Sequence, residues 1–112
     1  MSRTFDMAAL EWETVRPDVA RGVYGKTLMD KGVKLVFTRV AAGGGFALHR
    51  DAYGHLLHFL AGSGYVDLNG ERLRVYPGLV VEITAGDEHG YQNTGNEDLI
   101  LISANLPASI NN

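Results

Sequence analysis

The sequence predicts an all-β protein of the barrel or sandwich type. Three observations lead to this prediction: fourteen glycines spread along 112 residues, short runs in which polar and apolar residues alternate, and a strong hairpin signal at Asn69-Gly70. Glycine-rich breaks between short alternating runs are typical of many short strands joined by tight turns. Asn and Gly both tolerate the positive φ angles of a two-residue hairpin turn. A chain of this length builds one hydrophobic core and leaves no room for a second domain.

Glycine and proline breaks divide the chain into its expected elements. Residues 43–45 are three glycines and are expected to form a loop, because glycine turns without a Cβ clash. Residues 6–12 are the helical candidate, with Asp6 as the cap. The predicted strands are residues 34–40, 46–49, 55–61, 65–68, 71–76, 79–83, 89–92 and 99–103. Residues 1–30 are expected to add N-terminal edge strands, residues 31–105 to form the barrel core, and residues 106–112 to form a C-terminal tail.

Composition excludes several functional classes. The formal net charge of -3 provides no basic field for phosphate backbones, so we expect no nucleic-acid partner. The chain has no cysteine, so imidazole, carboxylate or other oxygen ligands would have to hold a metal ion. Residues 1–15 lack an unbroken apolar core, and no stretch approaches 18 apolar residues. We therefore expect a cytoplasmic protein without membrane contact.

The four histidines are the residues best suited to metal chemistry. His49 and Asp51 are two positions apart and would leave the same face of a strand. His55 begins the next predicted strand, after a connection short enough to bring it back beside His49. His58 has the opposite parity to His55, so we expect it to point away and to have a structural or interface role. His89 lies far along the sequence, and spacing alone does not place it with the others.

These residues form a pattern that resembles the first motif of the cupins, a family of small β-barrels that commonly bind one metal ion in the barrel mouth. The cupin motif is a glycine, five residues, His-x-His, three or four residues, Glu, six residues and a glycine. Here the same spacing reads Gly43, His49, Asp51, His55 and Gly62. Aspartate replaces the second histidine of the motif, and histidine replaces its glutamate.

The second cupin motif is matched as well. It consists of a glycine, five residues, Pro-x-Gly, two residues, His, three residues and Asn. The sequence has Gly78, Thr84, Gly86, His89 and Asn93 at these positions, so only the proline is replaced. Two gapped motifs in register are a specific signal, and together they cover about half of the chain.

The resemblance implies a single-domain, cupin-type jelly-roll barrel, also called a double-stranded β-helix, with six to eight strands. Its metal ligands would be His49, Asp51, His55 and His89. Both substituted positions keep a side chain that can bind metal, which favours a working site over a vestigial one. We expect one divalent transition metal ion; Zn, Fe, Mn, Ni and Cu all suit three imidazoles and a carboxylate.

Asp51 has further roles open to it. Aspartate is shorter than histidine, so its oxygens could fall short of a metal placed for imidazole. It could then fix a ligand histidine by accepting a hydrogen bond, or act as a base on bound water. It could also simply cap the turn near Tyr53-Gly54.

Strand parity suggests which side chains surround the ion. Tyr91 shares parity with His89 and would donate a hydrogen bond to a bound ligand. Phe37, Arg39 and Phe59 are expected to face the interior, where Arg39 would favour an anionic substrate such as a carboxylate. Tyr91 and Arg39 are therefore the candidate catalytic residues. The alternatives are a surface ion pair for Arg39 on the outer face and a packed aromatic role for Tyr91.

The resemblance leaves three functions open. The first is a metal-dependent isomerase or lyase acting on a small anionic molecule such as a sugar acid. Residues 12–15 and 19–25 resemble small cupins grouped with the pectin-degradation proteins, which help convert unsaturated uronates to linear keto-sugars. That group carries a functional carboxylate on the last strand, where this chain has Ser103. The second function is an iron- or copper-dependent dioxygenase, and the third is a non-catalytic barrel that binds or senses a small ligand.

The predicted strand 55–61 also suggests self-association. Leu56 and Leu60 lie opposite Leu57 and Phe59, so both faces of this strand are apolar. An apolar outer face needs a cover. We expect a homodimer.

Overall fold

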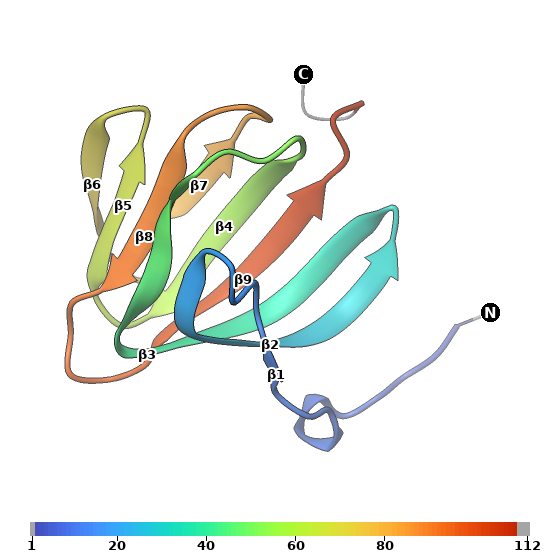
Figure 1. The fold of residues 1–112 in the computed structure, drawn as a ribbon. Helices are drawn as coiled ribbons and strands as arrows, with labels where there is room; N and C mark the ends of the chain where they lie inside the picture. Colours follow the sequence, from blue (N-terminus) through green and yellow to red (C-terminus); the bar gives the residue numbers. More distant parts are fainter. Residues whose placement is uncertain (1, 110–112) are drawn as a thin grey trace.

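The computed structural model describes residues 2–109, and within this range the chain forms nine β-strands and one short 3-10 helix (Figure 1). The all-β prediction is confirmed. The elements are η1 (Met7–Ala9), β1 (Glu13–Thr14), β2 (Ala20–Lys31), β3 (Val33–His49), β4 (Gly54–Ala61), β5 (Gly64–Leu68), β6 (Glu71–Val75), β7 (Val80–Ile83), β8 (His89–Asn93) and β9 (Leu99–Leu106).

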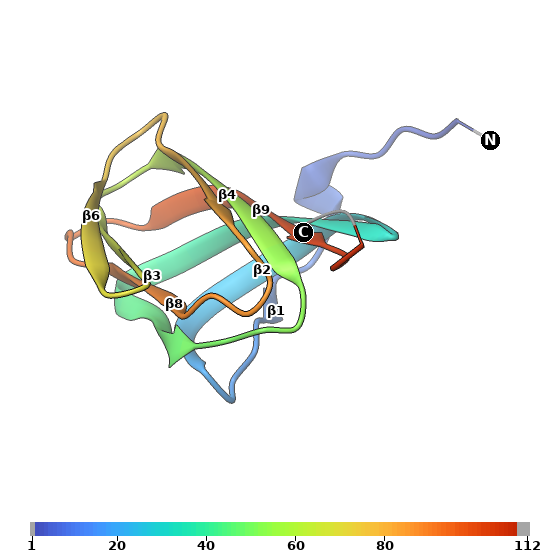
Figure 2. The same ribbon diagram turned by 90° about the horizontal axis from the view of Figure 1, so that it is seen from above.

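All the strands belong to one antiparallel sheet that curls on itself into an open barrel (Figure 2). Seven of them follow the order β6-β5-β8-β3-β9-β4-β7, and β2 and then β1 continue the sheet from β3. β3 joins the two halves of the barrel, because residues 34–40 pair with β9 and residues 45–49 pair with β8. The two cupin-like motifs thereby meet where β3 ends and β8 begins.

The triple glycine does not form the expected loop, and that prediction is wrong. β3 runs through residues 43–45 without a break. A Cβ added to Gly44 would lie 2.6 Å from the carbonyl oxygen of Arg21, and one added to Gly45 would collide with the carbonyl oxygen of Tyr91. The glycines therefore let β3 pass close to β2 and β8 rather than turn away from them. An irregular register after Phe46 then brings His49 opposite His89.

Two local predictions are confirmed. Asn69 and Gly70 form the tight β5–β6 turn with φ angles of 48° and 84°. Asp6 caps η1, since its Oδ1 accepts a hydrogen bond of 2.9 Å from the backbone N–H of Ala8. The helix is a single turn, and no helix in the described range is long and apolar enough to span a membrane.

Apolar side chains from both halves of the sheet pack together inside the barrel. On β4, the inward residues His55, Leu57 and Phe59 are buried, whereas Leu60 on the other face is 38% exposed. This is the predicted alternation. Each large apolar side chain in the core contributes about 1.5–3 kcal/mol by its burial. The buried cluster consists of Val23, Val40, Leu57, Phe59, Val66, Val75, Val81, Ile83, Tyr91, Leu99 and Leu101.

Phe37 and Arg39 lie on the outer face of β3, so the expectation that they face the interior is wrong. Val36 and Thr38 take the inward positions and line the cavity described below. Because side chains alternate along a strand, residues 37 and 39 must point the other way.

On the outer face, Arg39 holds the N-terminal segment. Its guanidinium stacks between the rings of Trp12 and Tyr24, with its central carbon 4.8 Å from each ring centroid. A guanidinium nitrogen lies 3.8 Å from a carboxylate oxygen of Asp98. Lys26 reinforces the contact, since its Nζ lies over the Trp12 ring and donates to the backbone oxygen of Met7. Arg39 is therefore a cation–π and ion-pair residue of the outer surface.

Candidate metal centre

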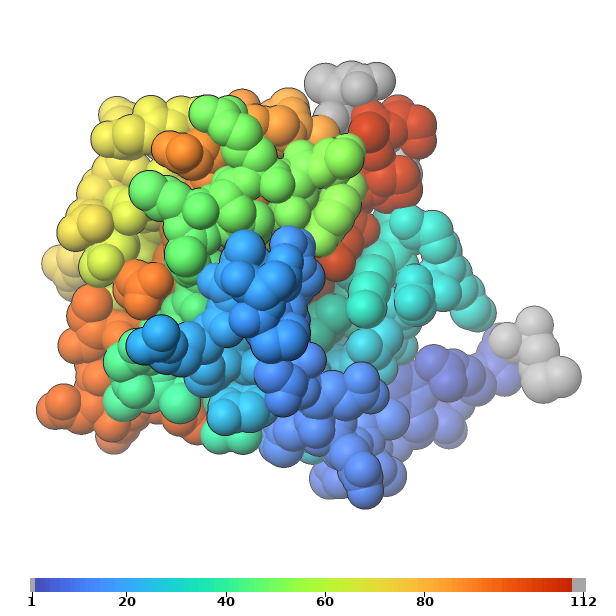
Figure 3. Space-filling model, viewed as in Figure 1, coloured from blue at the N-terminus to red at the C-terminus, as the bar shows by residue number. Residues whose placement is uncertain are grey.

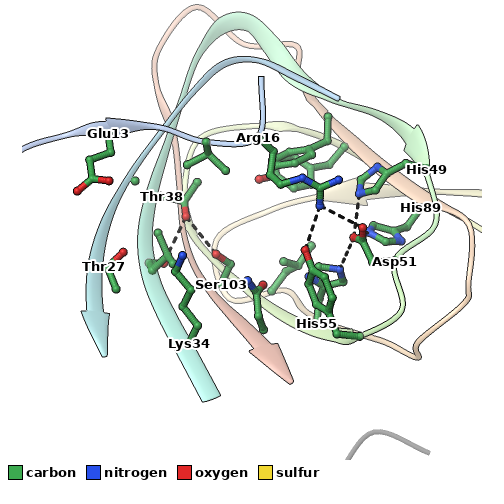
Figure 4. A pocket seen from close by; sticks show the side chains of 18 of the residues that line it. Glu13, Arg16, Thr27, Lys34, Thr38, His49, Asp51, His55, His89 and Ser103 are labelled. Atoms are coloured by element: carbon green, nitrogen blue, oxygen red, sulfur yellow. Dashed lines mark hydrogen bonds and ion pairs between the residues drawn. The ribbon is translucent and has the colours of Figure 1, made fainter. Parts of the chain in front are cut away.

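A cavity of about 290 Å³ opens from the barrel interior and has two chemically different ends (Figure 4). The segment from β1 to Arg16 forms one of its walls, and this N-terminal part of the chain lies across the front of the molecule against the stretch joining β3 to β4 (Figure 3). The histidine end consists of His49, Asp51, His55 and His89, with Arg16 beside them. The hydroxyl end consists of Thr27, Thr38 and Ser103, with Lys34 beside them.

Three strands and one connection bring the ligand candidates together. His49 is the last residue of β3 and is the cross-strand partner of His89, the first residue of β8. His55 follows from the next strand, near the start of β4. Asp51 lies in the connection between β3 and β4, where its backbone oxygen accepts a 2.9 Å hydrogen bond from the N–H of Gly86. Tertiary folding thus places His89 beside His49, which sequence spacing alone did not predict.

All three imidazoles direct Nε2 toward one oxygen of Asp51. The Oδ2 atom lies 2.9 Å from Nε2 of His55, 3.1 Å from Nε2 of His49 and 3.6 Å from Nε2 of His89. One ligand atom each from His49, Asp51 and His89 lies within 4.8 Å of the other two. Asp51 is therefore long enough to reach the point on which the histidines converge.

Backbone carbonyls fix two of these rings in the orientation that metal binding requires. Nδ1 of His49 lies 2.7 Å from the carbonyl oxygen of Ala47, and Nδ1 of His89 lies 2.9 Å from that of Asp87. Since a carbonyl only accepts, each Nδ1 carries the proton and donates it. A neutral ring held in this way carries its lone pair on Nε2, as in a metal-ligating histidine.

This arrangement fits a divalent cation. With neutral rings, Nε2 of His49 and Oδ2 of Asp51 are both acceptors, and a cation between them would satisfy both. In an octahedral site with bonds of about 2.1 Å, neighbouring ligand atoms lie about 3.0 Å apart, and in a tetrahedral site about 3.4 Å. The 3.1 Å separation between Asp51 Oδ2 and His49 lies within these limits, and the separations of 2.9 Å from His55 and 3.6 Å from His89 lie close to them. Imidazole and carboxylate together suit divalent transition metals.

The local environment sets the protonation states of these groups. Burial lowers the pKa of His55 and of His89 below the ordinary value, so both rings are neutral near pH 7. Burial acts to raise the pKa of Asp51, but hydrogen bonds from Arg16 and His55 outweigh it, and the pKa falls below its usual value. Asp51 is therefore ionised and ready to bind a metal, whereas His55 has to give up the Nε2 proton that it donates to Asp51 before Nε2 can bind one.

Arg16 is part of the site and was not predicted from the sequence. Its Nη1 donates to Oδ1 of Asp51 and to the hydroxyl of Tyr53, each at 3.0 Å. Its Nε and Nη2 donate to the carboxylate of Asp18 at 3.2 and 3.1 Å. Arg16 has a φ angle of 41°, in the left-handed region that costs a non-glycine residue roughly 1–2 kcal/mol. The Pro17-Asp18 pair signals a turn, but nothing in the sequence shows that this turn lies over the histidines.

The hydroxyl end is built from neighbouring strands. The Thr38 and Ser103 hydroxyl oxygens on β3 and β9 lie 3.1 Å apart, and Thr38 also donates to the backbone oxygen of Val36 at 3.3 Å. Because the Thr38 proton is directed to Val36, Ser103 donates to Thr38 and keeps its lone pairs for a ligand donor. Ser103 thus belongs to a neutral hydroxyl pair.

The other predicted residues divide between cavity and scaffold. Tyr91 lines the cavity as predicted and also packs on Phe46, with ring centroids 5.0 Å apart. Burial raises the pKa of Tyr91, so its phenol remains a proton donor. Asn93 instead braces the β8–β9 turn by donating to the backbone oxygens of Val40 and Glu97. His58 has the opposite parity and is absent from the described cavity wall, as predicted.

Comparison with known proteins identifies the family. The cupin domain matches residues 36–105, well over half of the chain. The chain therefore belongs to the cupin domain family, and the motif resemblance is confirmed. No curated protein matches the chain.

Several solved structures share the whole fold. A predicted oxalate decarboxylase from Thermotoga maritima aligns with a TM-score of 0.83 and 21% identity over 94% of this chain and 99% of its own. The polyketide cyclase RemF from Streptomyces resistomycificus aligns with a TM-score of 0.85 and 22% identity over 96% and 80% of the two chains. KdgF from Halomonas sp. aligns with a TM-score of 0.79 and 19% identity over 94% of each chain. At these identities the likeness establishes the fold.

Proposed function

We propose that this cupin binds one divalent transition metal ion through His49, Asp51, His55 and His89 and acts as an isomerase or lyase on a small, hydroxylated organic anion such as a sugar acid. The observation that carries the proposal is the convergence of these four side chains at one end of a cavity with Arg16 beside them and Lys34 at its other end. Zn, Fe, Mn, Ni and Cu are the candidate ions.

The size and charge of the cavity support a small anionic ligand. A volume of about 290 Å³ is at the lower end of the range for small-molecule sites. Lys34 lines the wall and can pair with a carboxylate, while Arg16 adds positive charge although its nitrogens already bond to Asp18, Asp51 and Tyr53. Thr38 and Ser103 offer hydrogen bonds to ligand hydroxyls between these charges. One structural neighbour carries the name of a predicted oxalate decarboxylase, which agrees with a small anionic substrate in this fold.

The protein side chains would divide the work of catalysis. A divalent ion at the histidine end would act as a Lewis acid that polarises a substrate oxygen. Tyr91 keeps its proton because burial raises its pKa, and it would donate a hydrogen bond to a developing negative charge. Among the described residues that line the cavity, Glu13 and Asp51 are the carboxylates.

The test is an assay of untagged protein loaded separately with Mn, Fe, Ni or Zn. We expect metal-dependent loss of the ultraviolet absorbance of an unsaturated uronate, without oxygen consumption. An unchanged absorbance with every metal would reject the uronate reaction. Substrate-dependent oxygen uptake would instead identify a dioxygenase, and tight substrate binding without turnover would identify a ligand-binding barrel.

The homodimer stays a prediction. Leu60 and Val80 on the neighbouring strands β4 and β7 are 38% and 52% exposed, which gives the barrel an uncovered apolar surface. Light scattering at micromolar concentration would detect the expected dimer, and a monomeric mass would reject it.

A further inference from the structure

We propose that Arg16 is a positioning residue that holds Asp51 with a single oxygen facing the metal site. The inference rests on the proposed metal site and concerns a side chain that neither cupin-like motif contains. It follows from the different partners of the two carboxylate oxygens of Asp51. Oδ1 accepts from Nη1 of Arg16 at 3.0 Å, whereas Oδ2 faces the Nε2 atoms of the three histidines.

Asp51 needs a partner because the hydrogen bond from Gly86 holds its backbone but does not fix the rotation of its side chain. Its position lies in the β3–β4 connection, outside the regular strands, and its side chain rotates about two bonds. A carboxylate that is free to rotate can offer a metal either oxygen or both. The hydrogen bond from Arg16 to Oδ1 leaves Oδ2 as the oxygen available to the site, so Asp51 is preorganised as a monodentate ligand.

Arg16 is itself held from two further directions. Its Nε and Nη2 form a forked pair with Asp18, and its Nη1 also donates to the hydroxyl of Tyr53. The Tyr53 ring lies against the ring of His55, with centroids 5.0 Å apart. The turn that carries Arg16 is closed by hydrogen bonds from Val19 and Ala20 to its backbone oxygen. A guanidinium fixed at all three nitrogens can impose one orientation on the carboxylate beside it.

The test measures Co²⁺ affinity by competition with a chromophoric chelator. Because partners of metal ligands typically contribute 10–100-fold to metal affinity, we expect Arg16→Met to lose at least about 10-fold. Arg16→Lys keeps the charge but lacks the fork, so we expect it to lose at least about 3-fold. Arg72→Met is the matched control, because Arg72 forms the same forked pair with Asp67 on β5, outside the described cavity wall. It should bind Co²⁺ as the wild type does.

A double-mutant cycle separates positioning from general damage. If Arg16 acts through Asp51, Arg16→Met should cause no further loss of Co²⁺ affinity in an Asp51→Ala background. The visible absorption of bound Co²⁺ should also change in Arg16→Met, because the carboxylate is free to bind through both oxygens. Wild-type affinity in Arg16→Lys, or an equal loss with and without Asp51, would overturn the proposal. Should Arg16→Met fail to fold, Arg16→Lys carries both measurements.

The two proposals fail in different ways. Wild-type protein that binds no Co²⁺ would reject the metal site itself. Wild-type protein that binds Co²⁺ as tightly as both Arg16 variants would retain the metal site and reject only the role of Arg16.

Discussion

The two ends of the cavity differ in where their polar atoms point. At the histidine end, three imidazole nitrogens and a carboxylate oxygen converge on one point. At the hydroxyl end, Thr38 and Ser103 bond to each other and leave only spare lone pairs for a ligand. Nitrogen and oxygen atoms gathered in this way can bind a cation, whereas the hydroxyl pair is already hydrogen-bonded. One cavity thus has a group of side chains that could hold a metal ion at one end and a hydrogen-bonded hydroxyl pair at the other.

Removal of a histidine ligand should have the largest effect on metal affinity. We expect His49→Ala and His89→Ala each to lower metal affinity by more than about 100-fold, since the loss of a ligand exceeds that of a supporting partner. His58→Ala is the matched control on the opposite face of β4 and should bind metal normally. Isothermal titration with Zn²⁺ would measure all three, and equal losses would contradict the parity of β4.

Acidity should affect the histidine end next most strongly. Burial lowers the pKa of His55 and of His89 in the folded state. Below the ordinary histidine pKa of about 6.5, the unfolded chain therefore binds more protons than the folded protein does. The free energy of unfolding of the metal-free protein should therefore fall as the pH drops from 7.5 to 5. Urea unfolding at several pH values would measure this. His55→Asn should reduce the slope, and a slope unchanged in that variant would assign the effect elsewhere.

A substitution at the hydroxyl end should have a smaller effect, and it should change ligand affinity rather than metal affinity. Ser103→Ala removes one neutral hydrogen bond, which is worth about 0.5–1.5 kcal/mol, or roughly 2–13-fold in ligand affinity. We expect metal affinity to stay at the wild-type level and the binding of a hydroxy acid to weaken. A variant that loses metal affinity would show that the two ends are not separate.

The smallest effect on the cavity is expected from Arg39→Ala. Arg39 stacks between Trp12 and Tyr24 on the outer face, so its loss should cost roughly 1–2 kcal/mol of stability through two cation–π contacts. Metal affinity should not change. Thermal unfolding would measure the loss of stability, and titration of the same sample with metal would measure metal affinity. A weaker metal affinity would show that Arg39 contributes to the metal site.

The sequence predicted the positions that local rules control. Alternation along β4 placed His55 inward and His58 outward, whereas only the resemblance to the second cupin motif implied that His89 joins His49. Asn69-Gly70 was predicted because the turn type depends on those two residues alone.

The predictions that were wrong or missing depend on contacts between segments far apart in the sequence. Gly44 and Gly45 lie within a strand because the backbones of β2 and β8 approach them closely, and no local sequence pattern predicts that contact. The parity of β3 was assigned wrongly for Arg39 because both faces of that strand are apolar or aromatic. Arg16 was missed because its role depends on a turn folding across the β3–β4 connection, 35 residues further along the chain.

Elemental analysis of untagged, metal-reconstituted protein is the direct test of the proposed metal site. The structure predicts one divalent metal ion per chain in the wild type and in His58→Ala, and no stoichiometric metal when His49 and His89 are both replaced by alanine. A wild-type protein without stoichiometric metal after reconstitution would contradict the assignment of the His49, Asp51, His55 and His89 cluster.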